Sequence, residues 1–201
     1  MCAPARTAAL VAALVAAPLA VAADEPEEQI KAFVGLGLGS GVASYNVNGE
    51  RITFSNVFQG AADEAPFVAV NVLSFGVDVG RNLFAGADLT GVAQSGTVGA
   101  SKTSLQISNY FASLTWFPWE RGLFLKAGAG ASSFFLSSGP QSERVWGPGV
   151  LVSAGYALRI TGAHHLTLSA EQAWQWYTGS GATKPDSSQY SAAFLGYMWR
   201  P

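Results

Sequence analysis

The chain has 201 residues, of which 49% are apolar and only 12% are Asp, Glu, Lys or Arg. Soluble domains carry about 25% charged residues, so this sequence has too little charge for an ordinary water-facing surface. Its 12% aromatic content excludes a disordered chain, and its net charge of -2 excludes the basic face of a nucleic-acid-binding protein. The chain must therefore shelter much apolar surface, either in a core or in lipid.

Residues 1–23 are predicted to be a secretory signal segment that is removed. Residues 8–17 form a short apolar run, and Ala20-Val21-Ala22 is an A-x-A cleavage pattern. A transmembrane anchor is the weaker interpretation, because the run is shorter than the ~20 residues that span a bilayer. Residues 24–31 would then be a short acidic lead, and the mature chain would lack cysteine because Cys2 is the only one.

Beyond the lead, residues alternate with period two along several segments. Large or aliphatic side chains occupy one parity, and Gly, Ser, Thr or a lone charge occupies the other, which is typical of β-strands with two unlike faces. No run approaches the ~18 apolar residues of a helical membrane span. Eight strands are predicted, at residues 32–43, 67–79, 83–93, 104–116, 123–135, 149–160, 166–177 and 189–199.

The predicted connections alternate between short and long, so one end of the sheet is tidy and the other elaborate. The short connections are 80–82, 117–122 and 161–165, and the long ones are 43–66, 94–103, 136–147 and 178–188. In the fourth strand, Leu105 and Ile107 fall on the opposite parity from Leu114 and Trp116. This mismatch predicts a β-bulge near Asn109.

Such a sheet can close as a soluble barrel with its apolar face inward or as a membrane barrel with its apolar face outward. In the soluble form, the small polar face would meet water with too few charges to keep it soluble. In the membrane form, the same residues fill a narrow polar interior and the apolar face meets lipid. The charged residues of that face are Asp78, Asp88, Lys126, Arg159 and Glu171. We therefore predict an all-β, eight-stranded antiparallel up-and-down transmembrane β-barrel.

Aromatic residues gather near both ends of the predicted strands, as in the aromatic girdles of membrane barrels. The residues of the first girdle are Trp116, Phe117, Trp119, Tyr197 and Trp199, and those of the second are Trp174, Trp176 and Tyr177.

The final alternation of Ala193, Leu195, Tyr197 and Trp199, together with the hairpin around Trp116-Phe117-Pro118, resembles the eight-stranded outer-membrane barrels of Gram-negative bacteria, of the OmpA transmembrane-domain and OmpX type. The resemblance covers roughly 32–199 and leaves 200–201 as a C-terminal extension. It implies an outer-membrane location with both termini periplasmic, outer-membrane lipid as the surroundings, and the barrel-assembly machinery as a partner during biogenesis.

A charge that faces lipid at mid-depth would cost ~2 to 4 kcal/mol, so the five charged residues are expected to form an internal network of ion pairs and hydrogen bonds. These residues are Asp78, Asp88, Lys126, Arg159 and Glu171. Structural filling is the favoured role. The alternative is a gate on a narrow water path, in which breaking a pair that contains Lys126 would open conductance.

We predict no catalytic, cofactor or metal site. The two histidines, His164 and His165, lie adjacent in a short turn without further ligands in the pattern. The His-x-Ser pattern of barrel lipid A deacylases is absent. The protein is therefore not expected to be an enzyme.

Asn48-Gly49 is a strong two-residue hairpin signal inside the long connection 43–66. This connection is predicted to be the main interaction surface, and a plug inside the lumen stays open as an alternative. The expected function is a structural or cell-surface interaction role with a surface partner that the sequence does not name. The alternatives are a narrow channel or conduit for small or hydrophobic solutes, and a soluble periplasmic ligand-binding barrel.

Overall fold

The computed structural model describes residues 31–61, 63–119, 122–178 and 184–201. The expected signal segment 1–23 and the lead up to residue 30 lie outside these residues. No helix in the described part is long and apolar enough to cross a membrane. The elements are β1 Ala32–Val47, β2 Glu50–Thr53, α2 Phe54–Phe58, β3 Val68–Gly80, β4 Leu83–Val98, β5 Ser101–Trp116, β6 Leu123–Ser138, β7 Gln141–Thr161, β8 His164–Trp176 and β9 Ser187–Trp199.

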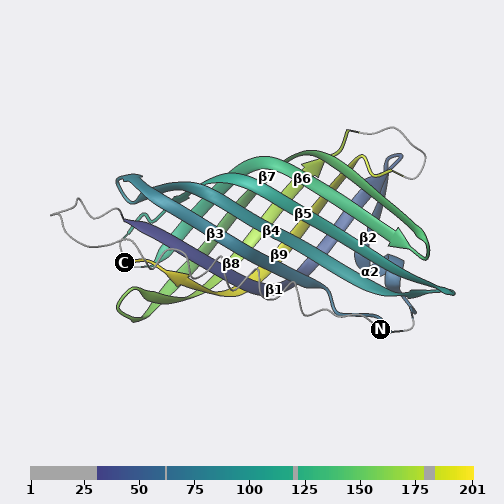
Figure 1. Cartoon of the computed structure of the whole chain (residues 1–201), viewed down its shortest axis with the longest axis horizontal. Helices are drawn as coiled ribbons and strands as arrows, with labels where there is room; N and C mark the ends of the chain where they lie inside the picture. Colours follow the sequence, from purple (N-terminus) through teal and green to yellow (C-terminus); the bar gives the residue numbers. More distant parts are fainter. Residues whose placement is uncertain (1–30, 62, 120–121, 179–183) are drawn as a thin grey trace. The chain divides into compact units, whose positions relative to one another are not determined.

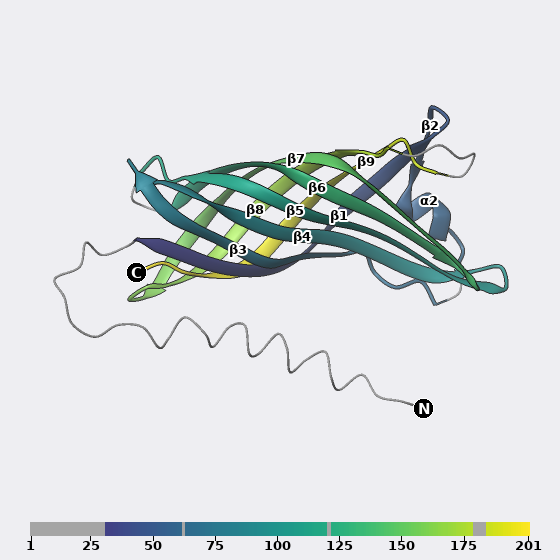
Figure 2. The same cartoon turned by 45° about the horizontal axis from the view of Figure 1, so that its top comes forward.

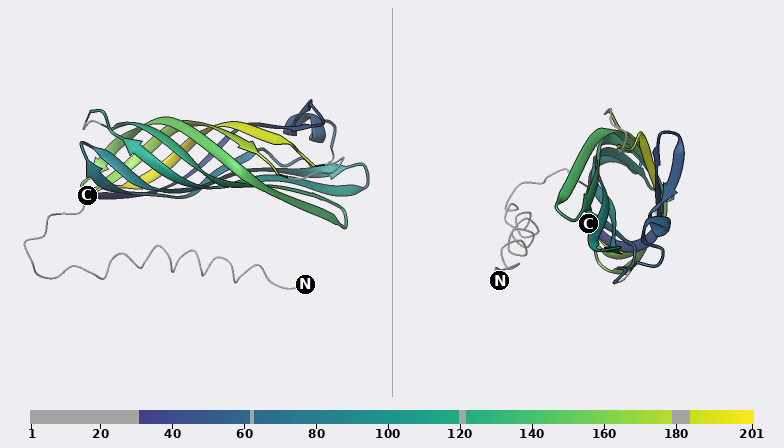
Figure 3. Two further views of the ribbon diagram at one scale, coloured as in Figure 1. Left: turned by 90° about the horizontal axis from the view of Figure 1, so that it is seen from above. Right: turned by 90° about the vertical axis from the view of Figure 1, so that its right-hand side faces the viewer.

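The strands form a closed ring. From β3 to β9, each strand pairs with the next in the chain, β1 pairs with β3, and β9 pairs back with β1 from Val34↔Trp199 to Asn46↔Ser187. All of these pairings are antiparallel. The strands cross the barrel obliquely, and the end-on view shows the ring (Figures 1 and 3). The predicted eight-stranded antiparallel barrel is confirmed, and β2 is an additional short strand that pairs with β1.

The two ends of the barrel differ, although not every predicted long connection is long. At the short-turn end, tight connections follow β3, β5 and β7, and this end also holds the start of β1 and the end of β9. The long-loop end holds the β1–β2 hairpin, α2 and the other connections (Figure 2). At the tip of the β1–β2 hairpin, Asn48 and Gly49 have φ of 52° and 82°, which fits a type I′ turn and confirms the hairpin signal.

Two of the predicted long loops are wrong, because the strands continue through them. In β4 and β5, pairing runs to Val98↔Ser101, and in β6 and β7 it runs to Ser138↔Gln141. The polar stretches 94–103 and 136–147 have a loop-like composition, but backbone pairing needs no particular side chain. As a result, two hairpins extend at the long-loop end (Figure 3).

The predicted bulge near Asn109 is also wrong. β5 pairs with β4 and with β6 without a register shift through this residue. Leu105 and Ile107 point inward and are fully buried, because the inner surface at this end is itself apolar. The register shifts of the described strands lie elsewhere, between Gly35 and Gly37, between Asn71 and Leu73, between Asp78 and Gly80, and between Arg159 and Thr161.

The outward face of the barrel is apolar. Leu38, Val42 and Leu168, for example, are between 64% and 69% exposed. Neighbouring backbones approach closely in this narrow ring, so a Cβ at Gly86 would collide with the Phe75 carbonyl. The alternative barrel with its apolar face inward, soluble in the periplasm, does not fit this surface and is rejected.

Candidate functional site

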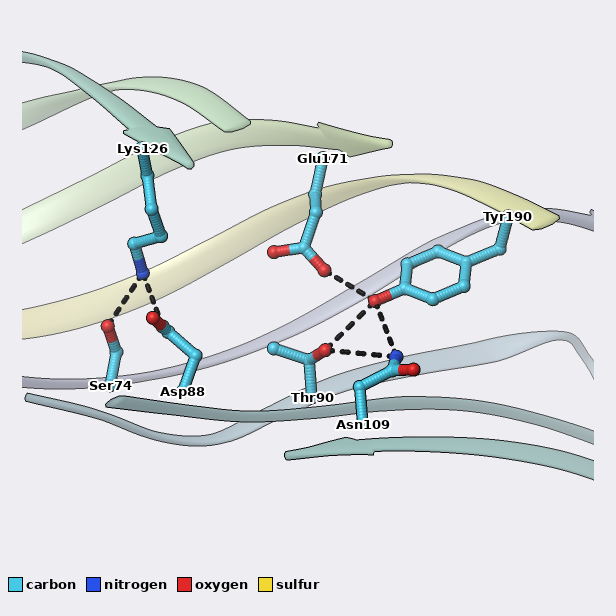
Figure 4. A network of polar contacts seen from close by, with 7 residues as sticks. All are labelled: Ser74, Asp88, Thr90, Asn109, Lys126, Glu171 and Tyr190. Atoms are coloured by element: carbon cyan, nitrogen blue, oxygen red, sulfur yellow. Dashed lines mark hydrogen bonds and ion pairs between the residues drawn. The ribbon is translucent and has the colours of Figure 1, made fainter. Parts of the chain in front are cut away.

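The centre of the interior holds a buried ion pair. Lys126 on β6 reaches across to Asp88 on β4 and forms an ion pair with its Oδ1 atom. The Lys126 Nζ atom also donates to the Ser74 Oγ atom on β3 at 2.7 Å (Figure 4). The Oδ2 atom of Asp88 is buried and has no hydrogen-bond partner among the described residues. Breaking such a pair is costly, because the remaining charge stays buried without compensation.

A second polar group lies beside the first and is centred on Tyr190 of β9. Its hydroxyl donates to the Glu171 Oε1 atom at 2.5 Å and accepts from the Asn109 Nδ2 atom at 3.1 Å. The Thr90 hydroxyl lies 2.9 Å from the same oxygen (Figure 4). All four side chains are buried. Sequence reasoning missed Tyr190, Asn109 and Thr90, although each occupies the inward parity of its strand.

Hydrogen bonds continue this network toward the long-loop end. The Ser132 hydroxyl donates to the Asn109 Oδ1 atom at 2.7 Å, and the Ser188 hydroxyl donates to the Gln175 Oε1 atom at 2.7 Å. The Tyr177 hydroxyl lies 2.6 Å from the Ser188 hydroxyl. Burial raises the pKa of the Tyr177 phenol, which follows the end of β8, so this group stays neutral. The Gln175 Nε2 atom donates to the Asn109 Oδ1 atom at 3.4 Å, so hydrogen bonds join the polar side chains from Tyr190 to Tyr177.

An apolar cluster closes the interior at the long-loop end, and α2 supplies its centre. The Thr53 hydroxyl caps the helix by accepting from the Asn56 amide, and Phe54 and Phe58 are both buried. The Phe54 ring lies 6.3 Å from the Phe134 ring. The strands contribute further apolar side chains, among them Val92, Leu105, Ile107, Phe111 and Phe134. The predicted connection 43–66 thus forms a hairpin in its first part and plugs the mouth of the barrel with α2.

A second apolar cluster closes the interior at the short-turn end. The Phe84 ring lies 5.5 Å from the Phe33 ring and 5.4 Å from the Phe117 ring. Phe124, Ala157 and Met198 complete this cluster. The Arg200 guanidinium lies 4.2 Å from the centre of the Phe117 ring. The interior is therefore polar in the middle and has an apolar cluster toward each end, and Gln175 and Ser188 carry the polar network into the long-loop half.

Two solved structures share this architecture. Neisserial surface protein A is 12% identical with a TM-score of 0.53, and the match covers 85% of this chain and 97% of that one. Ail, the attachment invasion locus protein of Yersinia pestis, in complex with the heparin analogue sucrose octasulfate, is 10% identical with a TM-score of 0.54, and the match covers 86% of this chain and 99% of that one. Both are eight-stranded outer-membrane β-barrels.

The chain has the fold of the eight-stranded outer-membrane β-barrels. Because the sequence identities are low, the likeness to these structures shows the fold alone. Comparison of the sequence with protein-family models and with curated proteins finds no match.

Among the five charged residues predicted for the interior of the barrel, the structure brings Asp88, Lys126 and Glu171 to the central layer. The other two, Asp78 and Arg159, lie at the short-turn end and do not belong to this network. Asp78 accepts from the Gly80 amide at 2.7 Å, and the Arg159 Nε atom donates to the Gly162 carbonyl at 2.7 Å. They have the inward parity, but the strands end before their side chains can reach the centre.

Most of the predicted girdle residues lie on the outer surface of the barrel. These residues are Trp116, Trp119, Tyr197 and Trp199 toward the short-turn end, and Trp174 and Trp176 toward the long-loop end. Phe117 and Tyr177 were wrongly predicted to belong to the girdles, because both are buried and belong to the two apolar clusters. Each follows the last residue of a strand, where alternation no longer fixes the direction of the side chain. Tyr110 and Trp146, which stack with ring centres 5.9 Å apart, were missed on the outer surface.

The predicted turn position of the histidines is wrong, because His164 and His165 are the first two residues of β8 and pair with β9. The His164 Nδ1 atom lies 2.5 Å from the Tyr197 hydroxyl, and the His165 Nδ1 atom lies 3.0 Å from the Ala163 carbonyl. In the described ranges, no group of three or more His, Cys, Asp or Glu side chains is arranged to hold a metal ion.

Proposed function

We propose that the protein is an outer-membrane barrel that acts as a closed anchor and presents its long-loop end at the cell surface for interaction. One observation carries this proposal: both ends of the interior are filled with apolar side chains, while two hairpins extend at the long-loop end. Barrels of this type have short periplasmic turns and longer extracellular loops, which favours a periplasmic short-turn end.

The extended hairpins offer an edge to a partner chain. β7 pairs with β8 only from Gly149 onward, and the Trp146 carbonyl accepts from the Thr178 amide at 3.2 Å, so residues 141–145 have β6 as their one strand partner in the described chain. An exposed strand edge presents unpaired backbone groups to another extended segment. Val98 and Trp146 on the same projecting sheet are 40% and 46% exposed, which adds apolar contact surface.

The two apolar clusters argue against the alternative of a channel. A water path needs a continuous polar lining, and here the polar layer is bounded by Phe58 and Phe134 on one side and by Phe84 and Phe117 on the other. The attachment role in the name of Ail motivates an adhesion assay. Charges of both signs at the long-loop end of this chain do not favour a purely anionic ligand.

The orientation can be tested with epitope insertions. A tag between Gly139 and Pro140 should bind antibody on intact cells, whereas a tag between Gly162 and Ala163 should bind only after the outer membrane is opened. Labelling of the second tag on intact cells would reverse the orientation. Absence of both tags from the outer-membrane fraction would refute the location.

The surface role can be tested by shortening the β6–β7 hairpin. Phe135 and Arg144 pair directly, so replacing residues 136–143 with Asn-Gly keeps the register of the barrel. Deleting 45–58 is less suitable, since it removes Phe54 and Phe58 from the plug. We expect cells that carry the shortened protein to lose adhesion to host-cell surfaces while the barrel still shows heat-dependent electrophoretic mobility. Adhesion equal to that of the unaltered protein would contradict a role of this hairpin.

A further inference from the structure

The short-turn end contains a hollow of about 460 Å³ beside the turn that joins β7 and β8. Its lining combines three kinds of side chain. Arg159 and Arg200 are cationic, His165 is a buried imidazole, and Tyr156 and Leu158 belong to the apolar outward face. The polar network at the centre of the barrel uses none of these residues.

Arg159 at the end of β7 and Arg200 after β9 are both held against the turn that joins β7 and β8. The Arg159 Nε atom donates to the Gly162 carbonyl at 2.7 Å, which fixes the side chain against the turn. The Arg200 amide donates to the Ala163 carbonyl at 2.7 Å, which ties the C-terminal extension to the same turn. Arg159 pairs with His165 across the β7–β8 ladder, and both residues line the hollow together with Arg200, whose guanidinium also lies over the Phe117 ring.

Among the described side chains that line this hollow, two are cationic and none carries a carboxylate. Among the described residues, no carboxylate lies within salt-bridge distance of Arg159. A guanidinium group matches the oxygens of a phosphate with several donors in a fixed fork, and such charge-assisted hydrogen bonds are stronger than neutral ones. The arginines therefore favour a phosphate-bearing anion.

The apolar part of the lining indicates which kind of phosphate. Tyr156 and Leu158 are 48% and 56% exposed and continue the lipid-facing surface of β7 into the hollow. A free phosphate would gain nothing from these side chains, whereas a phospholipid could lay an acyl chain along them. The hollow thus places a cationic group where the lipid-facing wall meets the barrel end.

We propose that this hollow binds the phosphate group of an anionic phospholipid in the adjacent leaflet. Arg159 and Arg200 hold the phosphate, and the acyl chain lies along Tyr156 and Leu158. The site rests on the proposed membrane location but is independent of the surface role, because lipid binding is measured on the purified barrel and needs no adhesion partner.

The test is native mass spectrometry of the purified full-length protein with phosphatidylglycerol or phosphatidylcholine carrying identical acyl chains. We expect the unaltered protein to retain phosphatidylglycerol about tenfold more than phosphatidylcholine. The double variant Arg159→Gln and Arg200→Gln should lose this preference. A matched control, Arg51→Gln with Arg144→Gln, removes the same charge at the long-loop end and should keep it. Equal retention of both lipids by the unaltered protein, or an unchanged preference in the double variant, would overturn the proposal.

Two further arms separate the alternatives. Arg159→Lys keeps the charge but loses the Nε hydrogen bond to the turn, so it should keep most of the preference if charge is decisive. Inorganic phosphate is tested alone, and binding of phosphate without any preference between the lipids would overturn the assignment to a phospholipid. Heat-dependent electrophoretic mobility identifies the variants that have folded, and only these are compared.

Discussion

The two ends of the barrel interior are both closed by apolar side chains, but they are built differently. At the short-turn end, Phe33, Phe84 and Phe124 project from the strands themselves, and Phe117 follows directly after β5. At the long-loop end, the centre of the cluster is Phe54 and Phe58 on α2, a helix carried by the connection between β2 and β3.

This difference indicates how each closure could be undone. Side chains on strands cannot leave the interior unless the ring itself is distorted. The segment that includes α2 can separate more easily, because its described hydrogen bonds to β4 are those from the Ala65 amide to the Ser95 carbonyl and from the Gln94 side chain to Glu64. Local opening is therefore expected at the long-loop end and global unfolding at the other.

The largest expected effect concerns the polar layer between the two clusters. Lys126→Met leaves the buried Asp88 carboxylate without its partner, which should lower the free energy of unfolding by about 3 to 5 kcal/mol. The measurement is urea unfolding of the barrel in lipid vesicles. The double variant Lys126→Met with Asp88→Leu removes both charges and should recover most of the loss. A single variant as stable as the unaltered protein would show that the pair is not buried as described.

Next in size is the cluster of the short-turn end. Phe84→Ala removes a ring that contacts two others, and we expect a loss of about 3 kcal/mol in the global free energy of unfolding. The same urea titration measures it. Leu114→Ala, which truncates a lipid-facing side chain on the neighbouring strand, serves as the control and should cost less. Equal losses would indicate that the cluster does not hold this end together.

Phe58→Ala sharpens the comparison at the long-loop end. The ring is fully buried, but its loss should act mainly on the segment 54–67, because this segment can open while the ring of strands stays closed. We expect a global loss below about 1 kcal/mol together with faster proteolysis of that segment. A global loss as large as that of Phe84→Ala would mean that the plug and the barrel unfold as one unit.

The smallest effect is expected at the β1–β2 hairpin. Gly49 has φ of 82°, so Gly49→Ala forces a side chain into the left-handed region at a cost of roughly 1 kcal/mol. The loss should appear as faster hydrogen exchange in β2, with an unchanged urea midpoint. Gly128→Ala is no suitable control, since a Cβ there would crowd the Ala112 carbonyl, whereas Glu50→Ala on the exposed side of β2 is suitable.

The parts of the fold that follow from alternation could be predicted from the sequence. Leu114 and Trp116 point outward and Asp88 and Lys126 point inward because each belongs to a strand with two unlike faces. The lengths of the strands could not be predicted, because Gly, Ser and Thr in 94–103 and 136–147 are compatible with both loops and strands. The parity of Leu105 and Ile107 was observed correctly but interpreted as a bulge, since the apolar plug that they contact was not expected.

The candidate site could be predicted only in part from the alternation along the strands. Parity identifies an inward charge but not its depth along a tilted strand, so Asp78 and Arg159 were grouped with Lys126 although they lie at the barrel end. Tyr190 was missed because a buried hydroxyl becomes informative only when its partner Glu171 is placed beside it. The role of α2 required tertiary structure, since a five-residue helix has no recognisable period.

The most direct test of the closed anchor is conductance in planar lipid bilayers. The protein should give no discrete current steps, because apolar clusters close the polar layer at both ends. Lys126→Ala and Glu171→Ala should leave this baseline unchanged, since they alter only the layer between the clusters. Regular steps from the unaltered protein, or steps that appear on loss of Lys126, would contradict the account and favour a gated channel.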